Sequence, residues 1–254
     1  MENNGLLFDF PACVETLRAS EGERDSIGLL REKILHRALK EYYISLYPEA
    51  IPEEKVGSYS ADLFLPGKNT IIEIQTGSFY PLKKKIAYYL DNTDCNIIVA
   101  HPMPAVKYLF WIDERDGSVS SPRKSPKKAT ARDALKEIFW LGERIGDPRL
   151  SFDLILMELE EYRFLCGYSA DRKRGSERYE YVPIRLLERL CLCGKDDIRA
   201  LFPQLPERFC QKDISRAFRQ KGRAVSHLAR LAVLCGLSEE DGKEGRTIYY
   251  RRKS

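Results

Sequence analysis

Residues 60–77 read SADLFLPGKNTIIEIQTG, and this stretch decides the fold class that the sequence favours. Polar and apolar residues mostly alternate before a Pro-Gly dipeptide, and a run with three isoleucines follows it. Two such runs on either side of a turn signal are typical of a β-hairpin. Because alternate side chains of a strand share a face, we expect Glu73 and Gln75 on one face of the sheet and the neighbouring isoleucines on the other.

Two carboxylates are predicted to meet in this hairpin. The turn brings Asp62, at the start of the first strand, alongside Glu73 in the second. Two carboxylates among apolar strands are costly to bury unless a cation neutralises them. Carboxylate oxygens are hard ligands that suit Mg²⁺ or Mn²⁺ and not zinc. The sequence therefore predicts a divalent cation, Mg²⁺ or Mn²⁺, bound by Asp62 and Glu73.

The segments around the hairpin predict an α/β domain. Residues 26–46 carry an amphipathic helical pattern, and residues 79–91 suit a second helix with Pro81 in its first turn. Residues 95–100 read as a buried strand and residues 107–113 as another. The order of helix, hairpin, helix and strand is that of an α/β fold.

This arrangement resembles the PD-(D/E)xK nuclease superfamily over about residues 25–113. Asp62, ten intervening residues and then the run Glu73-Ile74-Gln75 match the spacing of that superfamily's motif. The resemblance implies a restriction-endonuclease-like mixed sheet flanked by helices, and metal-dependent hydrolysis of phosphodiester bonds in DNA. Gln75 stands where the superfamily usually has a lysine, although some of its branches carry Glu-x-Gln.

The resemblance also implies roles for residues outside the carboxylate pair. Gln75 is neutral and can only donate or accept a hydrogen bond, so it would position the attacking water. Lys85, or else Lys83, would supply the missing positive charge at the developing phosphorane, unless these lysines are simply a solvated face. Glu32, on the preceding helix, would support a second ion or an outer-shell water.

The C-terminal segment predicts a second module. Residues 211–218 and 223–235 suit two helices around a tight turn, and residues 239–250 suit a strand–turn–strand wing. This order resembles a winged helix-turn-helix domain, whose second helix enters the DNA major groove. The same fold also serves protein interaction, in which case its arginines are a solvated face. The candidate DNA contacts are Arg223, Ser226, His227, Arg230 and Arg246.

The charge distribution favours a polyanionic partner. Residues 207–254 carry 12 Lys and Arg against 6 Asp and Glu, whereas residues 1–111 carry 12 against 15. Nucleic acid is the first candidate for a partner of such a basic module. Residues 114–130 form a basic Ser/Pro stretch that is either a linker or a loop that touches phosphate, and Thr130 is expected to cap a helix that follows.

Two domains are expected. Residues 1–180 would form the nuclease-like domain and residues 183–254 the winged-helix domain, with further helices over 184–193 and 195–202. Residues 150–165 fit a strand and a helix equally well. The seven cysteines, an odd number in a sequence without a secretory pattern, predict free thiols.

The two functional hypotheses share DNA as the partner. One is a metal-dependent DNA nuclease delivered by a winged helix; the other is a DNA-binding regulator or adaptor with a degenerate nuclease fold, which Gln75 favours. No stretch approaches the roughly 20 apolar residues of a membrane-spanning helix, and the start of the chain reads as no leader, so a cytoplasmic protein is expected. The sequence leaves open the preferred DNA structure and whether the chain forms a homodimer.

Overall fold

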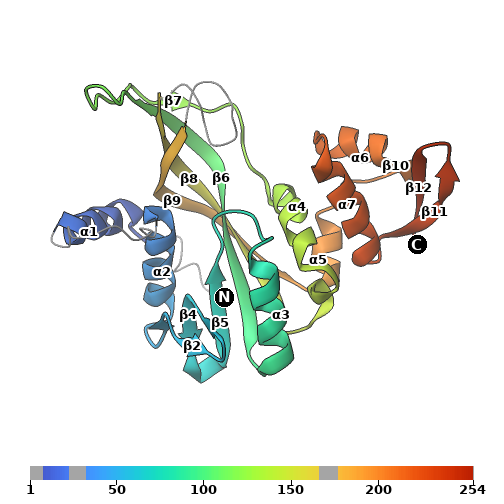
Figure 1. Cartoon of the computed structure of the whole chain (residues 1–254), viewed down its shortest axis with the longest axis horizontal. Coiled ribbons are helices and arrows are strands. Elements are labelled where there is room, and N and C mark those ends of the chain that lie inside the picture. Colours follow the sequence, from blue (N-terminus) through green and yellow to red (C-terminus); the bar gives the residue numbers. More distant parts are fainter. Residues whose placement is uncertain (1–7, 23–32, 166–176, 254) are drawn as a thin grey trace.

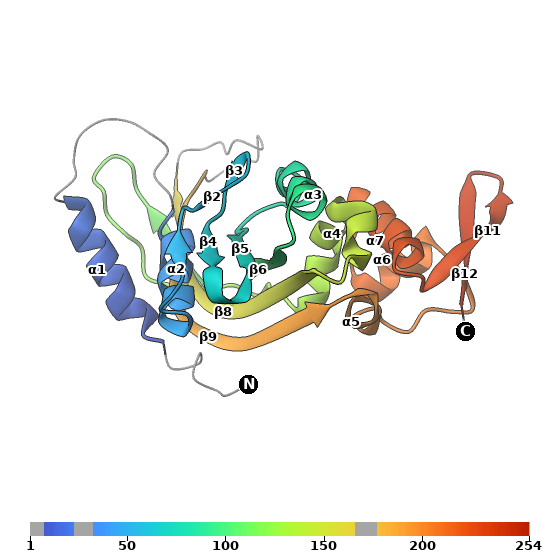
Figure 2. The ribbon, with the colours of Figure 1, turned by 90° about the horizontal axis from the view of Figure 1, so that it is seen from below.

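The computed structural model describes residues 8–22, 33–165 and 177–253 and shows an α/β protein built on a mixed central sheet (Figures 1 and 2). In spatial order the sheet contains β1 (Ile51–Pro52), β4 (Leu63–Leu65), β5 (Thr70–Ile74), β6 (Asn96–Ile112), β8 (Leu150–Phe164) and β9 (Glu177–Cys193), and β7 (Arg123–Lys124) pairs with β6. β4–β5 and β8–β9 are antiparallel, whereas β5–β6 and β6–β8 are parallel.

The predicted hairpin is confirmed as the β4–β5 pair. Its two strands are joined by the short helical turn η2 (Pro66–Lys68), which contains the Pro-Gly dipeptide. Asn69 ends the turn with a φ of 45°, in the left-handed region that asparagine tolerates better than most residues. Leu63 lies opposite Ile72, and this register fixes which side chains meet farther along the pair.

The two helices predicted around the hairpin cover opposite faces of the sheet (Figure 2). α2 (Ile34–Leu46) packs Leu39 on one face, and α3 (Leu82–Asn92) begins directly after Pro81 and packs Ile86 on the other. α3 also connects β5 to the parallel strand β6, as a crossover between parallel strands requires.

Three long strands replace several shorter predicted elements. β6 is continuous where separate strands were expected at 95–100 and 107–113, and residues 150–165 belong almost entirely to strand β8. The helix predicted over 184–193 is wrong, because these residues belong to β9, which pairs with β8 from end to end. That pairing satisfies the backbone of a half-buried segment and outweighs the helical spacing of its leucines.

The basic stretch after β6 is partly ordered by the sheet. Within it β7 pairs with β6, and the segment then leads to Thr130. Thr130 caps the next element as predicted, in a reciprocal capping box with Asp133. The expected single helix is instead a chain of short turns, η3 (Ala131–Ala134), α4 (Leu135–Ile138) and η4 (Phe139–Gly146), interrupted where Gly142 has a φ of 58°.

The C-terminal module, residues 207–254, follows helix α5 (Lys195–Ala200). It contains β10 (Arg208–Cys210), α6 (Gln211–Phe218), α7 (Arg223–Leu234), β11 (Ser238–Glu244) and β12 (Thr247–Arg252). The two predicted helices and the strand pair after them are present, and β10 adds a third strand in the order β10-β12-β11. The turn of the predicted strand–turn–strand wing is Gly245-Arg246, and the acidic residues before it lie mainly in β11.

Hydrophobic clusters lie on both faces of the central sheet. The cluster on the α2 side contains Ile72 and receives α1 (Phe10–Gly22), whereas the cluster on the α3 side contains Ile86 and Phe152. The second cluster continues without interruption into the C-terminal module through Leu228. The module is therefore packed against the rest of the protein and not suspended on a linker.

Two further sequence expectations can be compared with the described residues. Six cysteines in this part of the chain are free thiols: Cys13, Cys95, Cys191, Cys193, Cys210 and Cys235. Among the described helices, none combines the length and the hydropathy that crossing a membrane requires. The small strands β2 (Lys55–Val56) and β3 (Tyr59–Ser60) complete the fold as a separate two-stranded pair.

Candidate active site

Asp62 and Glu73 lie near each other at the end of the β4–β5 hairpin. Asp62 directly precedes β4, and its carboxylate accepts a hydrogen bond from the amide of Ile74, the residue after Glu73. The charge of Asp62 contributes to the raised pKa of Glu73, and the charge of Lys85 acts on Asp62. The hairpin therefore brings the two carboxylates that the sequence predicted to meet within electrostatic reach of each other.

Glu73 is held by two groups of α3. Its side chain is almost completely buried, with Lys85 Nζ 2.5 Å from Oε2 and the Tyr89 hydroxyl donating to Oε1 at 3.2 Å. Burial, together with the nearby charge of Asp62, raises the pKa of Glu73 to about 7 although Lys85 and Tyr89 oppose the change. Glu73 is thus poised to exchange a proton or a cation near neutral pH.

Asp62 is held from α2 and from the backbone of β5. Its Oδ2 accepts a hydrogen bond from the Ile74 amide at 2.7 Å and lies 3.3 Å from His36 Nε2, and Lys40 Nζ is 4.0 Å from Oδ1. Burial raises the pKa of Asp62, but the hydrogen bond and charge of His36, the Ile74 amide and the charge of Lys85 outweigh it, so the pKa lies below its ordinary value. Asp62 is the carboxylate of the pair that keeps its charge.

Sequence reasoning missed the two α2 residues that contact Asp62. Neither His36 nor Lys40 was among the residues predicted for this site, yet both reach the carboxylate from one face of the helix. Their spacing of four residues is the available signal, because residues i and i+4 of a helix share a face. Glu32, proposed on the same helix, lies outside the described residues.

Lys85, and not Lys83, is the lysine that meets the carboxylates. Lys85 is one turn into α3 on the side that faces β5, whereas Lys83 is exposed. Because the helix repeats every 3.6 residues, residues two positions apart point in different directions. The sequence favoured Lys85 over Lys83, and the position of α3 on the sheet places Lys85 beside Glu73.

Gln75 has a different use from the predicted one. It lies one residue beyond β5, and its side-chain Nε2 donates to the Ser78 carbonyl at 2.7 Å. Its own carbonyl lies 2.5 Å from His101 Nδ1 in β6. Gln75 therefore shapes the turn after β5 in this structure instead of pointing its amide at the carboxylate pair.

The donor set at this site fits Mg²⁺ or Mn²⁺. Mg²⁺ typically keeps several waters and binds through one or two carboxylates together with substrate phosphate, and Asp62 and Glu73 supply those two carboxylates. Lys85 and His36 now occupy their oxygens, so a cation would compete with these side chains. Within the described ranges no group of three or more His, Cys, Asp or Glu side chains is arranged around a common metal position.

The predicted DNA contacts on α7 divide into two sets. Arg223 and Arg230 are exposed and Ser226 is half-buried, whereas the His227 ring stacks on Phe139 of η4 with centroids 4.4 Å apart. Burial lowers the pKa of His227, and further positive charge from Arg223 and Arg230 acts in the same direction. The sequence prediction is corrected here: His227 packs α7 against the neighbouring segment, which the helical pattern of α7 alone did not reveal. Arg246, in the turn between β11 and β12, is exposed.

Comparison with known proteins identifies the domain that carries this site. Residues 33–193 match the family described as domain of unknown function DUF8091, which is more than half of the chain. This chain belongs to the DUF8091 family. An uncharacterized protein of Treponema pallidum (strain Nichols) is 27% identical over 238 residues, covering 90% of this chain and 88% of the relative. No solved structure matches.

The DUF8091 segment contains the whole central sheet. It begins at the residue before α2 and ends at Cys193, the last residue of β9, so it contains the central sheet from β1 to β9 and both candidate carboxylates. The boundary expected between residues 180 and 183 falls inside the DUF8091 segment and within strand β9. The C-terminal module lies beyond the DUF8091 segment.

Proposed function

We propose that this DUF8091 protein is a metal-dependent DNA nuclease with a restriction-endonuclease-like catalytic domain. The observation that carries the proposal is that Asp62 and Glu73 lie within electrostatic reach of each other at the end of the β4–β5 hairpin, with Lys85 from the next helix on Glu73. Burying two carboxylates side by side in a sheet is unfavourable for stability alone. A site that pairs them beside a lysine is suited to bind a divalent cation and a phosphate.

Each residue has a chemical task in this proposal. Asp62 and Glu73 would hold Mg²⁺ or Mn²⁺, which when bound polarises a phosphodiester and acidifies water. Glu73 releases its proton near neutral pH, because its pKa is about 7. Lys85, displaced from Glu73, would place its positive charge beside the phosphate oxygens as their negative charge increases. Gln75 holds the turn to Ser78 and so keeps that edge of the site in place.

A non-cutting DNA-binding regulator or adaptor is the second candidate. Two contacts favour it: Lys85 forms an ion pair with Glu73, and the Gln75 amide donates to the Ser78 carbonyl. A nuclease would need these side chains available for the metal ion, the water and the phosphate. Both candidates include a winged-helix C-terminal module that contacts DNA through the exposed Arg223, Arg230 and Arg246.

One cleavage assay separates the two candidates. Labelled single-stranded, duplex and branched DNAs are incubated with the full-length protein and either Mg²⁺ or Mn²⁺, beside Glu73→Gln and Asp62→Asn variants. We expect cleavage by the wild type that depends on the metal and is lost in both variants. Lys55→Ala, which removes an exposed lysine of β2, is the matched control and is expected to cut normally. If the protein binds these DNAs but cuts none of them, the nuclease proposal fails and the DNA-binding regulator or adaptor remains.

A further inference from the structure

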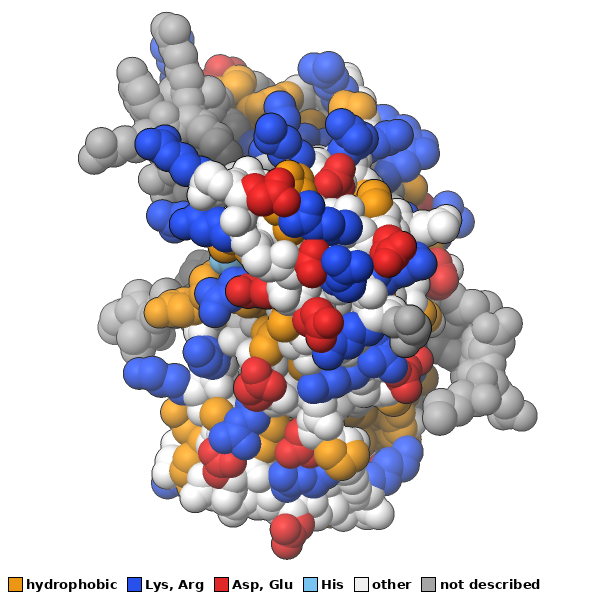
Figure 3. Space-filling model, turned by 90° about the vertical axis from the view of Figure 1, so that its right-hand side faces the viewer, with side chains coloured by type: hydrophobic (Ala, Val, Ile, Leu, Met, Phe, Trp, Pro, Cys, Tyr) orange, Lys and Arg blue, Asp and Glu red, His pale blue; other side chains and the backbone are white. Residues whose placement is uncertain are grey.

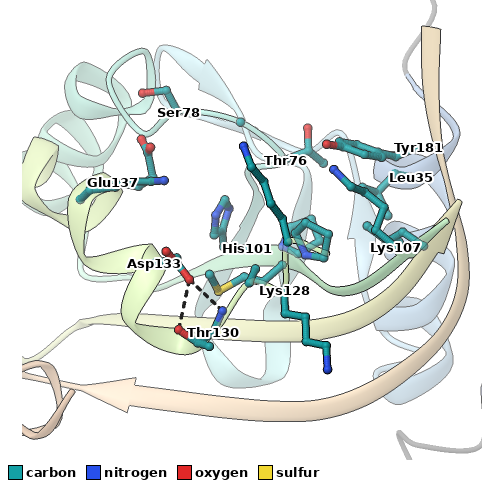
Figure 4. Close-up of a pocket in the computed structure, with 18 of the residues that line it drawn as sticks. Leu35, Thr76, Ser78, His101, Lys107, Lys128, Thr130, Asp133, Glu137 and Tyr181 are labelled. Atoms are coloured by element: carbon teal, nitrogen blue, oxygen red, sulfur yellow. Dashed lines mark hydrogen bonds between the residues drawn. The ribbon is translucent and has the colours of Figure 1, made fainter. Parts of the chain in front are cut away.

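A cavity of about 910 Å³ opens beside the candidate active site (Figure 4). Thr76, Gly77 and Ser78, which directly follow Gln75, form part of its wall, and so does His101, whose Nδ1 contacts the Gln75 carbonyl. The end of α6 and the residues after it also line the cavity. The cavity thus lies where the central sheet, the basic segment and the C-terminal module meet.

The walls of this cavity are strongly basic. Six lysines and arginines line it against two acidic residues: Lys107, Lys127, Lys128, Lys136, Arg178 and Arg219. The two acids are already engaged, since Asp133 caps Thr130 and accepts from Gln220, and Glu137 accepts from the Phe79 amide. Both acids keep their negative charge in these hydrogen bonds, and the six basic side chains still exceed the two acidic ones by four.

The basic residues differ in whether a carboxylate already holds them. Lys107 and Arg178 both approach Glu161, at 2.5 and 3.7 Å, and these contacts hold them at the wall. For the other four, by contrast, the described part of the chain offers no ion pair: Lys127, Lys128, Lys136 and Arg219. Four cations without a carboxylate partner around one concave site suit a ligand with several phosphates.

The outer surface of the C-terminal module has a different character. In Figure 3, which views the molecule from that end, lysine and arginine side chains are interspersed with aspartate and glutamate. Arg208 and Arg251, for example, both pair with Asp241. The net positive charge of the module is thus partly neutralised where it is most exposed, and the cavity is the more uniformly basic surface.

We propose that this cavity binds the sugar-phosphate backbone of single-stranded nucleic acid and leads it past Asp62 and Glu73. This inference rests on the proposed function, because it takes Asp62 and Glu73 as the cleavage site, and it names the substrate class of that site. A basic groove with aromatic side chains in its walls is the usual design of single-strand sites, and Tyr181 and Phe218 line this one. Its volume is that of a small-ligand pocket and leaves no room for a duplex.

The basic segment after β6 thereby acquires a function. From the sequence, this segment could be either a linker or a loop that touches phosphate. The structure places Lys127 and Lys128 in the cavity wall, directly before the capped turn at Thr130. That cap orders the end of the segment. Lys127 and Lys128 are consequently presented on a defined backbone, which lowers the entropic cost of binding a ligand.

The test is a binding measurement in EDTA, so that it does not depend on cleavage. Fluorescence anisotropy with labelled oligothymidine compares the full-length wild type, the double variant Lys127→Ala/Lys128→Ala and the control Lys55→Ala/Lys68→Ala. The control removes the same charge from exposed positions of β2 and η2 outside the cavity. Loss of two phosphate contacts should weaken binding about tenfold and reduce the magnitude of the salt slope by about 1.4, whereas the control is unchanged.

Several outcomes would overturn the proposal. Equal weakening in both double variants would mean that only net charge matters. A blunt duplex of the same length that binds as tightly as the single strand, with the same dependence on Lys127 and Lys128, would remove the single-strand assignment. Equally effective competition by inorganic polyphosphate would make the cavity a general polyanion site. If the expected binding is found but no DNA is cut in Mg²⁺ or Mn²⁺, the cavity assignment stands and the nuclease fails.

Discussion

Lys85 Nζ lies 2.5 Å from Glu73 Oε2, and this ion pair joins α3 to the strand that carries the candidate catalytic carboxylate. The Glu73 side chain is only 3% exposed, whereas the Lys85 side chain is 19% exposed, so the lysine can move into solvent while the carboxylate stays buried. The contact stabilises the charged form of Glu73 while no cation is bound. It is also the contact that a bound cation and phosphate would replace.

Lys85→Met should raise the pKa of Glu73 above about 7, because the variant removes the nearest positive charge and leaves the burial. Titration of the glutamate carboxyl carbons by NMR measures this change. In the cleavage assay we expect a loss of about 100-fold, the usual effect of deleting one group that stabilises transition-state charge. Lys84→Met, at an exposed position of the same helix, is the control. An unchanged Glu73 pKa would show that the ion pair is absent in solution.

Glu73 should make the protein less stable as pH rises from about 4.5 to 7. The pKa of Glu73 is raised in the folded state, so between those values the folded chain binds the proton more readily than the unfolded chain, and the free energy of unfolding falls with increasing pH. Glu73→Gln has no such proton to lose. Thermal melts of the two proteins should therefore diverge in favour of the variant between pH 5 and pH 8. A difference in Tm that stays constant over this range would contradict the pKa shift.

His36→Ala should raise the pKa of Asp62, since His36 supplies both a hydrogen bond and charge to that carboxylate. Loss of a hydrogen bond to a charged group costs about 1.5–3 kcal/mol of unfolding free energy, which chemical denaturation measures. His36→Gln, which retains a donor, should recover part of that loss. If both variants unfold like the wild type, His36 does not hold Asp62.

Gln75→Ala should cost about 1 kcal/mol of stability, because it deletes one hydrogen bond, from Nε2 to the Ser78 carbonyl. Mg²⁺ affinity should stay nearly intact, since Asp62 and Glu73 carry the charge. Isothermal titration with Mg²⁺ and the cleavage assay examine both points. Gln75→Lys restores the common residue of the nuclease superfamily. A faster rate in that variant would show that the wild type is an attenuated enzyme, and an unchanged rate would show that Lys85 already supplies the charge.

His227→Ala should lower the stability of the protein, whereas Arg223→Ala should lower its affinity for DNA. His227 stacks on Phe139, so its loss should destabilise the protein by about 1 kcal/mol and leave DNA affinity unchanged. Arg223 is exposed, so its loss should weaken DNA binding in a salt-dependent manner and leave the stability unchanged. Anisotropy and thermal melts on the same two proteins test both statements. If His227→Ala binds DNA more weakly than the wild type while its stability is unchanged, His227 is a DNA contact after all.

The sequence by itself determined the local elements whose signals lie within a few residues. The Pro-Gly turn between two alternating runs was sufficient for the β4–β5 hairpin, and period two then placed Glu73 on a defined face of β5. The cap at Thr130 and the helix–turn–helix order of the C-terminal module were likewise readable, because caps, turns and helical periods are local features.

Only the tertiary structure decided the features that depend on partners distant in the sequence. Residues 184–193 became a strand because β8 lies beside them, and His36 acquired its role because α2 packs over the end of the hairpin. Lys127 and Lys128 became part of a cavity because the C-terminal module also lines it. Pairing, packing and burial of this kind are set by long-range contacts, and the periodicity of one segment contains no information about the surface that will cover it.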